Sequence, residues 1–358
     1  MIIGISIIII GLIFKIYKWI FIVGKAIIKK KFIKDFPYKI NLRNFISDFH
    51  VANQIKNKKI NCDVININNA FIRDYLWKKN LIKELDYSKY YDHISFFLKN
   101  FKYLSKWTLS YNKKKVIGIG QRFGNLNFVI NSNLIKKNTS ELEGYNLIIE
   151  NKNKFGILLF EDFNIMQIAL SGGINPFKKL NDKEISSFTN NCQLWFENAK
   201  LISNNYLKLN KLLIKKQIRF YLTGGTYTCS TARREGNYNI MSIIPKKKIN
   251  KLKQGLIFTE ITSVLKNSKV NAEKYLDFIL TEQKSYEIAM SKYTCNPVLQ
   301  MGNPKIFNRF SKNDLKIIQF DNLDDSKVHS FEYQIIPNYK KLLGIFKKIL
   351  SLYAHKII

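Results

Sequence analysis

Short apolar runs rich in Ile, Val and aromatic residues alternate with amphipathic segments along most of the chain. The runs predict strands, and the amphipathic segments predict helices. The strands are expected at residues 62–67, 115–120, 127–131, 155–160, 219–222, 238–243 and 255–265. The main helices are expected at residues 42–55, 71–76, 165–170, 183–202, 271–280, 283–291 and 340–353. This order predicts an α/β fold with mostly parallel sheets.

The stretch from Arg219 to Gly236 has the most informative local pattern. A short strand leads into Gly224-Gly225, whose backbone can adopt conformations that a Cβ atom would forbid. Ser230 or Thr231 can cap a helix over residues 232–235, and Gly236 can end it. Such a turn can bring unpaired N–H groups to a ligand. An ordinary strand-to-helix turn has the same pattern, so its function depends on the other segments.

The N-terminus carries an uncharged apolar run from Ile2 to Phe14, followed by lysines. The run is short for a membrane span, which needs about 20 apolar residues, and its length fits the apolar region of a secretory signal. No basic residue precedes it, and no clean cleavage site follows it. Residues 1–31 are therefore expected to be either a signal peptide or a membrane anchor.

Lysine and arginine outnumber acidic residues by 59 to 26, which gives a net charge of +33. Such an excess is typical of proteins that bind nucleic acid or an anionic surface. Here it is spread along the whole chain, and no zinc-finger spacing, RNA-binding aromatic block or helix-turn-helix pattern accompanies it. We therefore expect a solvated lysine-rich surface and no nucleic-acid partner, with a basic, membrane-anchored nucleic-acid-binding protein as the alternative from another class.

Cysteine and histidine patterns give little support to a catalytic or metal site. The four cysteines form no CxxC pair, and the four histidines are isolated from one another. No nucleophile–base pair or phosphate-binding loop stands out, so the sequence predicts neither an enzyme nor a cofactor or metal. A disulfide remains open, because the spacing favours no particular pair.

Several segments together resemble the extracellular solute-binding proteins of ABC importers, in the branch that contains spermidine/putrescine-binding proteins. The resemblance covers roughly residues 61–321. It is carried by residues 63–66 with 81–86, 116–124 with 128–131, 156–162, 221–225, 258–264, 271–279 and 293–297.

The resemblance implies a two-lobed, type II periplasmic-binding-protein-like fold that closes on a solute in an interlobe cleft. Lobe 1 would comprise residues 32–122 and 256–310, lobe 2 residues 123–255, and residues 311–358 a C-terminal helical segment. The family further implies a periplasmic or membrane-anchored extracytoplasmic location, with ABC permease and ATPase subunits as partners. We expect a monomer that performs no chemistry.

The candidate ligand-binding residues follow or interrupt apolar strand residues, where ligands of open α/β sheets bind. They are Gln121, Arg122, Phe123, Glu161, Asp162, Thr223, Gly224, Gly225, Thr226, Tyr227, Thr259 and Glu260. Polyamine binders of this family hold ammonium groups with carboxylates and stack the aliphatic chain on aromatic rings. Glu161, Asp162 and Glu260 supply candidate carboxylates, and Phe123, Phe160 and Tyr227 supply candidate rings.

The chain also departs from the family pattern. Tryptophan is absent beside Gly224 and from the return strand, and Arg122 would suit a carboxylate better than a dication. An anionic solute held by Arg122 and the N–H groups of Gly224 and Gly225 is therefore an alternative within the same fold. Between residues 31 and 61 the pattern predicts a helix but no first strand, which leaves the first lobe apparently trimmed.

Overall fold

The computed structural model of the chain describes residues 19–24, 35–43, 47–268 and 272–358. They fall into two compact units, which we treat separately. Unit 1 contains the described residues up to Gln121 together with Glu260–Ile288, and unit 2 contains Arg122–Thr259 with Ala289–Ile358. The chain passes from one unit to the other within two long strands, β4 (Ile119–Asn131) and β11 (Gly255–Val264), and a third time at the end of α11 (Glu282–Ala289). Residues 289–358 belong with unit 2, whereas the sequence prediction divided them between lobe 1 and a separate segment.

Unit 1 is built on a sheet in the order β2-β1-β3-β11. Its strands are β1 (Trp19–Gly24), β2 (Lys39–Arg43), β3 (Val64–Asn68) and the second half of β11. Strand β1 pairs in parallel with β2 and β3, and β11 pairs antiparallel to β3. Its helices are α2 (Asp48–Lys56), α3 (Tyr87–Ser95), α10 (Glu273–Leu280), α11 (Glu282–Ala289), a π-helical segment (Phe71–Leu76) and 3₁₀ segments (Trp77–Lys79, Lys99–Trp107).

Unit 2 contains the neighbouring strands β4-β7-β5-β6, with β8 also paired to β4 and β12 paired to β11. The strands are β5 (Phe155–Leu158), β6 (Leu201–Ser203), β7 (Phe220–Gly225), β8 (Ile240–Ile243) and β12 (Ser330–Glu332), and a separate hairpin is formed by β9 (Lys248–Ile249) and β10 (Leu252–Lys253). Strand β5 is parallel to both β6 and β7, whereas β4 is antiparallel to β7. The sheets are therefore mixed, and the expectation of mostly parallel sheets holds only for part of each unit.

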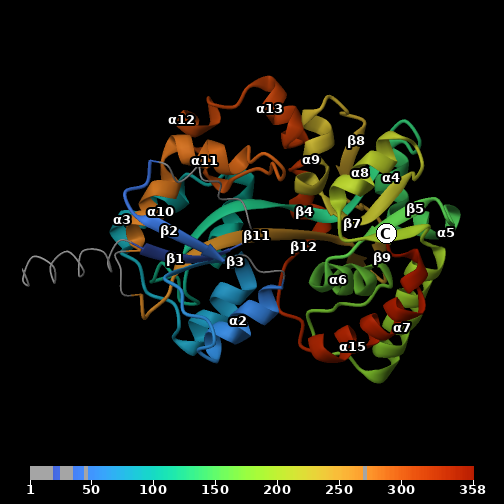
Figure 1. The fold of residues 1–358 in the computed structure, drawn as a ribbon, viewed down its shortest axis with the longest axis horizontal. Coiled ribbons are helices and arrows are strands. Elements are labelled where there is room, and N and C mark those ends of the chain that lie inside the picture. Colours follow the sequence, from blue (N-terminus) through green and yellow to red (C-terminus); the bar gives the residue numbers. More distant parts are fainter. Residues whose placement is uncertain (1–18, 25–34, 44–46, 269–271) are drawn as a thin grey trace, which may run out of the picture. The chain divides into compact units, whose positions relative to one another are not determined.

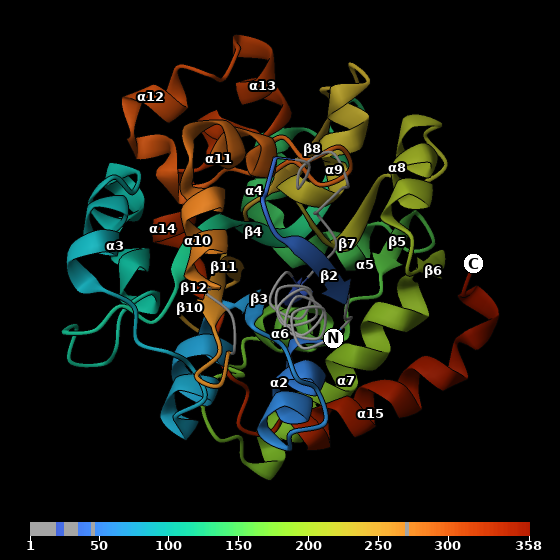
Figure 2. The same ribbon diagram turned by 60° about the vertical axis from the view of Figure 1, so that its left-hand side comes forward.

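Helices cover both faces of the unit 2 sheet (Figure 1). They are α4 (Lys137–Glu143), α5 (Leu147–Glu150), α6 (Glu161–Ser171), α7 (Asp182–Asn198), α8 (Tyr206–Ile214), α9 (Thr226–Arg234), α12 (Pro304–Phe307), α13 (Lys312–Ile317), α14 (Asp325–His329) and α15 (Tyr339–Leu352). Helices α6, α7 and α15 lie on one face, and α4, α8 and α9 on the other (Figure 1). Figure 2 shows α7 and α15 running alongside each other. Short 3₁₀ segments occur at Gly144–Asn146, Leu299–Gly302, Phe320–Asn322 and Ala354–Lys356.

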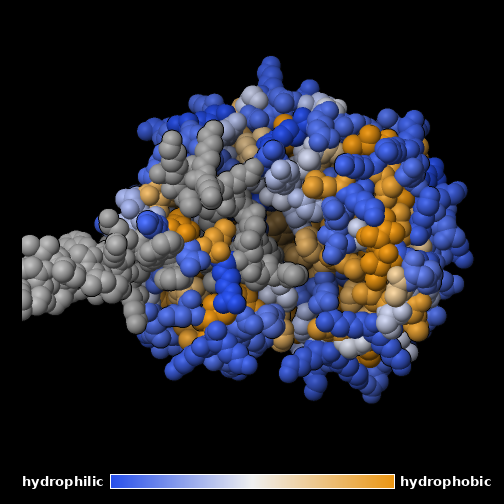
Figure 3. Space-filling model, viewed as in Figure 1, coloured by the Kyte–Doolittle hydropathy of each residue, from blue (hydrophilic) through white to orange (hydrophobic). Residues whose placement is uncertain are grey.

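The last residues of the chain extend the edge of the unit 2 sheet. Ile357 forms a parallel bridge with Ile202 of β6, and the Ile358 N–H donates to the Ile202 carbonyl over 2.9 Å. Lys356 Nζ donates to the carbonyls of Phe196, Glu197 and Ala199 at 2.7–3.0 Å, at the carboxyl end of α7. Figure 3 shows mainly hydrophilic side chains on the side of unit 2 that faces the viewer, with a hydrophobic stretch near the C-terminus. Ile357 and Ile358 are 44% and 45% exposed.

One N-terminal expectation was wrong, and one further strand was not predicted. A strand does lie between residues 31 and 61, because Lys39–Arg43 forms β2. Trp19–Gly24 lies inside the segment predicted to be a signal peptide or anchor, yet it forms β1 between β2 and β3. A continuously apolar run is what a parallel strand requires, and it cannot be distinguished from a membrane-directed segment by hydrophobicity alone. Most of residues 1–31 lie outside the described ranges. Among the described helices, none combines the length and apolarity that a membrane crossing requires.

Two interior expectations also need correction. The end of the strand expected at 115–120 and the strand expected at 127–131 belong to one continuous strand, β4, which runs through Gly124 between them. A Cβ at Gly124 would lie 2.9 Å from the Asn296 side-chain amide, so this glycine allows close packing within a strand. The helix expected at 232–235 begins at Thr226, directly after β7, and it is followed by Gly236 at φ +88° as predicted.

Candidate functional site

At the carboxyl end of β3, unit 1 gathers buried carboxylate and amide groups. Asn68 is the last residue of β3, and Glu260 lies directly opposite it on β11. Asp48 is the first residue of α2, where the Ser47 side chain caps the helix by accepting from the His50 N–H. Asp48, Asn68 and Glu260 are only 2%, 1% and 5% exposed. The Asn68 side-chain amide donates to Asp48 Oδ2, so Asn68 links the α2 carboxylate to the strand pair.

The same face of the sheet continues as a row of polar side chains. Asn66 Nδ2 donates to Thr262 Oγ1 over 2.8 Å, and Thr262 Oγ1 donates to Gln121 Oε1 over 2.9 Å. Residues two apart on a strand share a face, so Asn66 lies beside Asn68, and Thr262 beside Glu260. Ile65 and Ile67 occupy the opposite face and are fully buried. An apolar core would normally fill such positions, so this polar row calls for a reason beyond packing.

The group at the end of this row, Asp48, Asn68 and Glu260, is rich in hydrogen-bond acceptors. The Asn68 Oδ1 atom is buried and has no hydrogen-bond partner among the described residues. The carboxylates of Asp48 and Glu260 only accept hydrogen bonds, and Asn68 Oδ1 is one further acceptor. We name the three residues the unit 1 acceptor cluster. Its chemistry suits a ligand group that only donates hydrogen bonds and carries positive charge.

In unit 2, the carboxyl ends of three parallel strands present aromatic side chains. Strands β5, β6 and β7 are followed by α6, α8 and α9, and the strand ends lie at one edge because the strands are parallel. The aromatic residues at these junctions are Phe160, Tyr206 and Tyr227, each half-buried. We name these three the unit 2 aromatic edge. Phe160 and Tyr227 stack with centroids 6.2 Å apart and an interplanar angle of 27°.

The ring of Tyr227 has a further aromatic support from β11. It meets Phe258 in an edge-to-face contact, with centroids 5.9 Å apart at 84°. Phe258 is 5% exposed and also contacts Phe163 on α6, so it forms the buried base beneath the edge. Tyr206 donates its hydroxyl proton to the Tyr293 carbonyl over 3.1 Å. Burial raises the pKa of Tyr206, and nearby Arg122 opposes that rise. The edge is thus a largely apolar surface, and one of its phenols is hydrogen-bonded to the loop that contains Tyr293.

The Gly224-Gly225 turn serves packing within unit 2. Strand β7 runs through both glycines, and a Cβ at Gly225 would lie 2.1 Å from the Asn125 carbonyl oxygen. A Cβ at Gly224 would lie 2.3 Å from the Tyr221 ring. The Gly225 N–H donates to Thr228 Oγ1 over 2.9 Å. The expectation that this N–H is left unpaired for a ligand was therefore wrong, because α9 begins early enough for Thr228 to reach it.

Thr223 has a backbone conformation that is rare for a β-branched residue. Its φ is +63°, and it lies at the register shift where Asn127 and Phe128 of β4 face Gly224 and Leu222. The side chain is fully buried, and Thr223 Oγ1 accepts from Asn164 Nδ2 over 2.7 Å. Thr223 is thereby held between β7 and α6 as part of a β-bulge.

Arg122 and Phe123 lie inside unit 2. Arg122 Nη1 donates to both the carbonyl and the hydroxyl oxygen of Thr294, at 3.1 and 3.2 Å, and the residue is 5% exposed. Phe123 is fully buried, and its N–H donates to the Pro297 carbonyl over 3.1 Å. Both residues join β4 to the 294–298 segment of the same unit. Thr226 and Thr259 are buried to a similar degree, at 4% and 1% exposed.

The two adjacent carboxylates at the start of α6 point toward α15. Glu161 forms an ion pair of 3.3 Å with Lys347, and Tyr339 donates its hydroxyl proton to the Asp162 carboxylate. Acidic residues in the first turn of a helix also interact favourably with the helix dipole. Both groups therefore have structural contacts within unit 2.

The structure thus sorts the sequence-predicted residues into three sets. Gln121 and Glu260 belong to the polar face of unit 1, and Tyr227 belongs to the unit 2 aromatic edge. The remaining predicted residues make the packing or α15 contacts described above. Sequence reasoning missed Asp48, Asn68 and Tyr206. A helix-capping residue precedes two of these elements, Ser47 for α2 and Asn205 for α8. Such a capped helix start after a strand indicates the carboxyl end of that strand, and this pattern could have pointed to Asp48 and Tyr206.

The described residues hold no group of three His, Cys, Asp or Glu side chains placed to bind a metal. The four cysteines are free and buried, so the disulfide left open by the sequence does not form in this structure. Burial raises the pKa of Cys62 and of Cys192 to about 12, which makes both thiols poor nucleophiles.

No protein-family model and no curated protein sequence matches the chain. Solved structures do resemble it. A putative spermidine/putrescine ABC transporter protein from Listeria monocytogenes matches with a TM-score of 0.69 and 15% identity, over 94% of this chain and 99% of that one. The spermidine/putrescine ABC transporter substrate-binding protein from Streptococcus pneumoniae matches with a TM-score of 0.65 and 15% identity, over 95% and 99%.

Other similar structures bind different solutes. An ABC substrate-binding protein from Listeria monocytogenes in complex with cycloalternan matches with a TM-score of 0.64 and 13% identity, over 94% of both chains. At such low identities the similarity shows the fold, and it confirms the predicted α/β fold of the periplasmic-binding-protein type. Since a polyamine and a sugar both occur among the named solutes, the choice of solute must be argued from the residues of this chain.

Proposed function

We propose that this chain is the solute-binding subunit of an ABC-type importer and that its solute carries a primary-amine cation, as putrescine and spermidine do. The observation that carries the proposal is the unit 1 acceptor cluster, with the buried Asn68 Oδ1 that lacks a hydrogen-bond partner among the described residues. An ammonium group has three donors and no acceptor, so it complements this cluster. Charge-assisted hydrogen bonds of this kind are about twice as strong as neutral ones.

The unit 2 aromatic edge supports the same class of solute. Methylene chains next to an ammonium group gain both apolar burial and cation–π attraction from aromatic faces. Phe160 and Tyr227 offer half-buried faces of this kind. The placement of the solute between two lobes stays a prediction from the family resemblance, as do the permease and ATPase partners, the monomeric state and the extracytoplasmic location. The proposed role is capture and delivery, without catalysis.

The alternative within this fold, an anionic solute held by Arg122, has less support from the contacts. The Arg122 guanidinium donates to Thr294 within unit 2, and the Gly225 N–H donates to Thr228. A carboxylate would have to replace these contacts, whereas an amine would add hydrogen bonds to the acceptor cluster of unit 1.

Calorimetric titration with putrescine, spermidine and a small dicarboxylate tests the proposal. We expect saturable binding of one or both amines and none of the dicarboxylate. An Asp48→Asn variant should lose amine binding, because it removes one charge while keeping the size of the side chain and an acceptor for Asn68. The matched control is Asp182→Asn, at a fully exposed aspartate at the start of α7. Binding of the dicarboxylate alone, or no response to any solute, would contradict the proposed ligand class.

A further inference from the structure

A small β-hairpin in unit 2 concentrates lysines that its own fold does not neutralise. Strands β9 and β10 pair antiparallel, with Lys248 opposite Lys253 and Ile249 opposite Leu252. The turn between them contains Asn250 and Lys251. Like charges directly opposite each other on paired strands are destabilising. The repulsion between Lys248 and Lys253 therefore destabilises the hairpin.

The backbone conformation of the turn between β9 and β10 is also unfavourable. Asn250 and Lys251 both have positive φ, at +50° and +64°. A two-residue hairpin turn needs this conformation, and its second position usually holds glycine. A lysine there is strained, since its Cβ disfavours positive φ. The third lysine thus lies at the tip of the hairpin, beside the Lys248–Lys253 pair.

The rest of the hairpin is fixed to the body of unit 2. A Cβ at Gly173, which has φ +72°, would lie 2.6 Å from both the Ile249 and the Asn250 side chains. Lys253 Nζ donates to the Lys327 carbonyl over 3.4 Å, which joins β10 to α14. The hairpin therefore presents its lysines from a supported base.

The carboxylates near the hairpin are paired with lysines at its base. Lys246 forms ion pairs with Glu141 and Asp325, at 3.2 and 3.0 Å, and Lys247 pairs with Glu143 at 3.6 Å. Among the described residues, no ion pair to a carboxylate occurs at Lys248, Lys251 or Lys253. The positive charge is therefore uncompensated at the tip rather than at the base.

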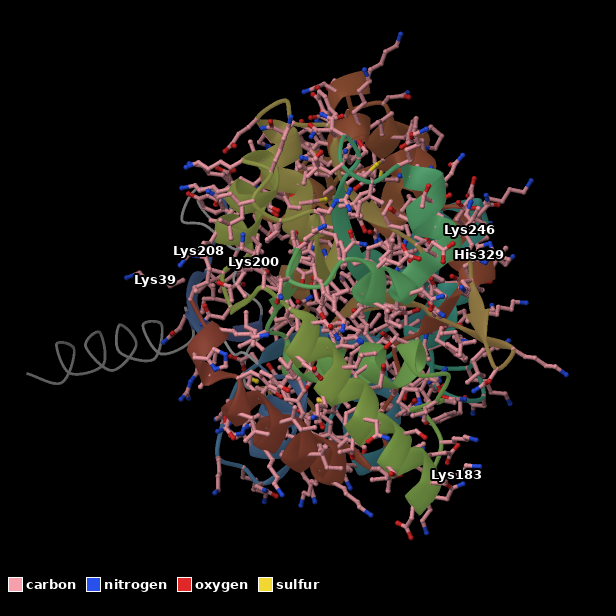
Figure 4. The ribbon with its side chains drawn as sticks, turned by 90° about the vertical axis from the view of Figure 1, so that its right-hand side faces the viewer. Lys39, Lys183, Lys200, Lys208, Lys246 and His329 are labelled. Carbon is pink, nitrogen blue, oxygen red and sulfur yellow. The ribbon has the colours of Figure 1, made fainter. Side chains whose placement is uncertain are left out.

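His329 on α14 lies beside this basic region, and Figure 4 shows it next to Lys246, on the opposite side of unit 2 from Lys200 and Lys208. Its pKa is lowered by burial, while Asp325 opposes that shift and Lys246, Lys253 and Lys248 add to it. The neighbouring Val328 is 58% exposed. Exposed aliphatic and lysine side chains together are typical of surfaces that rest on a bilayer interface.

We propose that the β9–β10 hairpin, with Lys248, Lys251 and Lys253, is a contact surface for an anionic lipid bilayer. An anionic headgroup layer would relieve the repulsion between the paired lysines without requiring a shaped partner. Lysines act as compact point charges, and each one near an anionic membrane adds to attraction independently of exact geometry. This surface is independent of solute binding, because none of its residues belongs to the acceptor cluster or the aromatic edge.

Co-sedimentation of the full chain with vesicles tests the proposal. Vesicles of phosphatidylcholine alone give the baseline, which includes any contribution of the apolar N-terminus, and equal parts of phosphatidylcholine and phosphatidylglycerol give the anionic case. We expect tighter binding to the anionic vesicles, and a loss of about a hundredfold in that preference when Lys248, Lys251 and Lys253 are all changed to Gln. The matched control changes Lys183, Lys208 and Lys340, three exposed lysines elsewhere in unit 2, to Gln.

A single variant distinguishes the effect of charge on vesicle binding from an effect on folding stability. Lys251→Gly removes the strain at positive φ, so it should raise the unfolding temperature while weakening anionic-vesicle binding severalfold. In addition, the pKa of His329, followed by NMR, should rise when anionic vesicles are added and stay constant with neutral ones. Equal losses in the hairpin and control variants would show that charge is diffuse and would overturn the proposal. So would a wild-type chain that binds both kinds of vesicle equally.

Discussion

The acceptor cluster of unit 1 and the aromatic edge of unit 2 occupy equivalent positions in their sheets but differ in chemistry. Both lie where parallel strands end and helices begin. In unit 1 this position holds Asp48, Asn68 and Glu260, all nearly inaccessible and rich in acceptors. In unit 2 it holds Phe160, Tyr206 and Tyr227, half-buried rings above an apolar base. The comparison teaches that one kind of backbone junction can supply either charge recognition or an apolar contact surface.

The two positions are also stabilised differently. The unit 1 cluster depends on side-chain hydrogen bonds, such as that from Asn68 to Asp48. The unit 2 edge depends on close backbone approach, because a Cβ at Gly225 would lie 2.1 Å from the Asn125 carbonyl oxygen. Substitutions should therefore change ligand binding in unit 1 and stability in unit 2.

The largest effect is expected from Gly225→Ala. The new Cβ would lie 2.1 Å from a backbone oxygen that cannot rotate away. We expect a loss of about 3 kcal/mol in the free energy of unfolding, at the upper end of the cost of overpacking. Urea unfolding followed by circular dichroism measures it. Gly344→Ala on α15 is the matched control, because a Cβ there meets no atom within 4 Å. Equal stability of the two variants would refute the close-packing explanation.

Asp48→Asn should have the next largest effect, on binding rather than stability. Removing one charge of a buried, hydrogen-bonded pair costs roughly 2–5 kcal/mol, so amine affinity should fall at least about thirtyfold. The unfolding free energy should change much less, because the amide of the new side chain can still accept from Asn68. Calorimetry and urea unfolding on the same sample separate the two. A parallel loss of stability and affinity would assign Asp48 a purely structural role.

Tyr227→Ala should weaken solute binding by about tenfold, the usual worth of one aromatic face in a cation–π or stacking contact. Tyr227→Phe keeps the ring that stacks on Phe160 and meets Phe258, so it should bind almost as the native chain does. Comparing the two dissociation constants tests whether the ring face or the hydroxyl matters. If the Phe variant lost as much affinity as the Ala variant, the aromatic edge would act through its hydroxyl instead.

Glu161→Gln should have the smallest effect. Glu161 is 42% exposed and forms its ion pair with Lys347 on α15, and such surface pairs contribute about 0–1 kcal/mol. Amine affinity should change less than about twofold. A large loss would show that Glu161 contacts the solute, and it would remove the contrast between an acidic unit 1 and an aromatic unit 2.

The sequence predicted the fold better than the site. Hydrophobic alternation located most strands and helices, including β11 and α7. It failed at β1, where an apolar parallel strand has the same pattern as a membrane-directed segment. At the site, Asp48 and Asn68 lie twenty residues apart, and only the folded sheet brings them together. Gly224 and Gly225 gave a strong sequence signal, yet close packing explains it.

The central claim is that unit 1 binds an amine cation through Asp48, Asn68 and Glu260. Its most direct test is a spermidine titration of the native chain, Asp48→Asn and Asp182→Asn by isothermal calorimetry. We predict saturable binding for the native chain and for Asp182→Asn, and a loss of at least about thirtyfold for Asp48→Asn. Equal affinities for all three proteins, or no heat of binding in any, would contradict the claim.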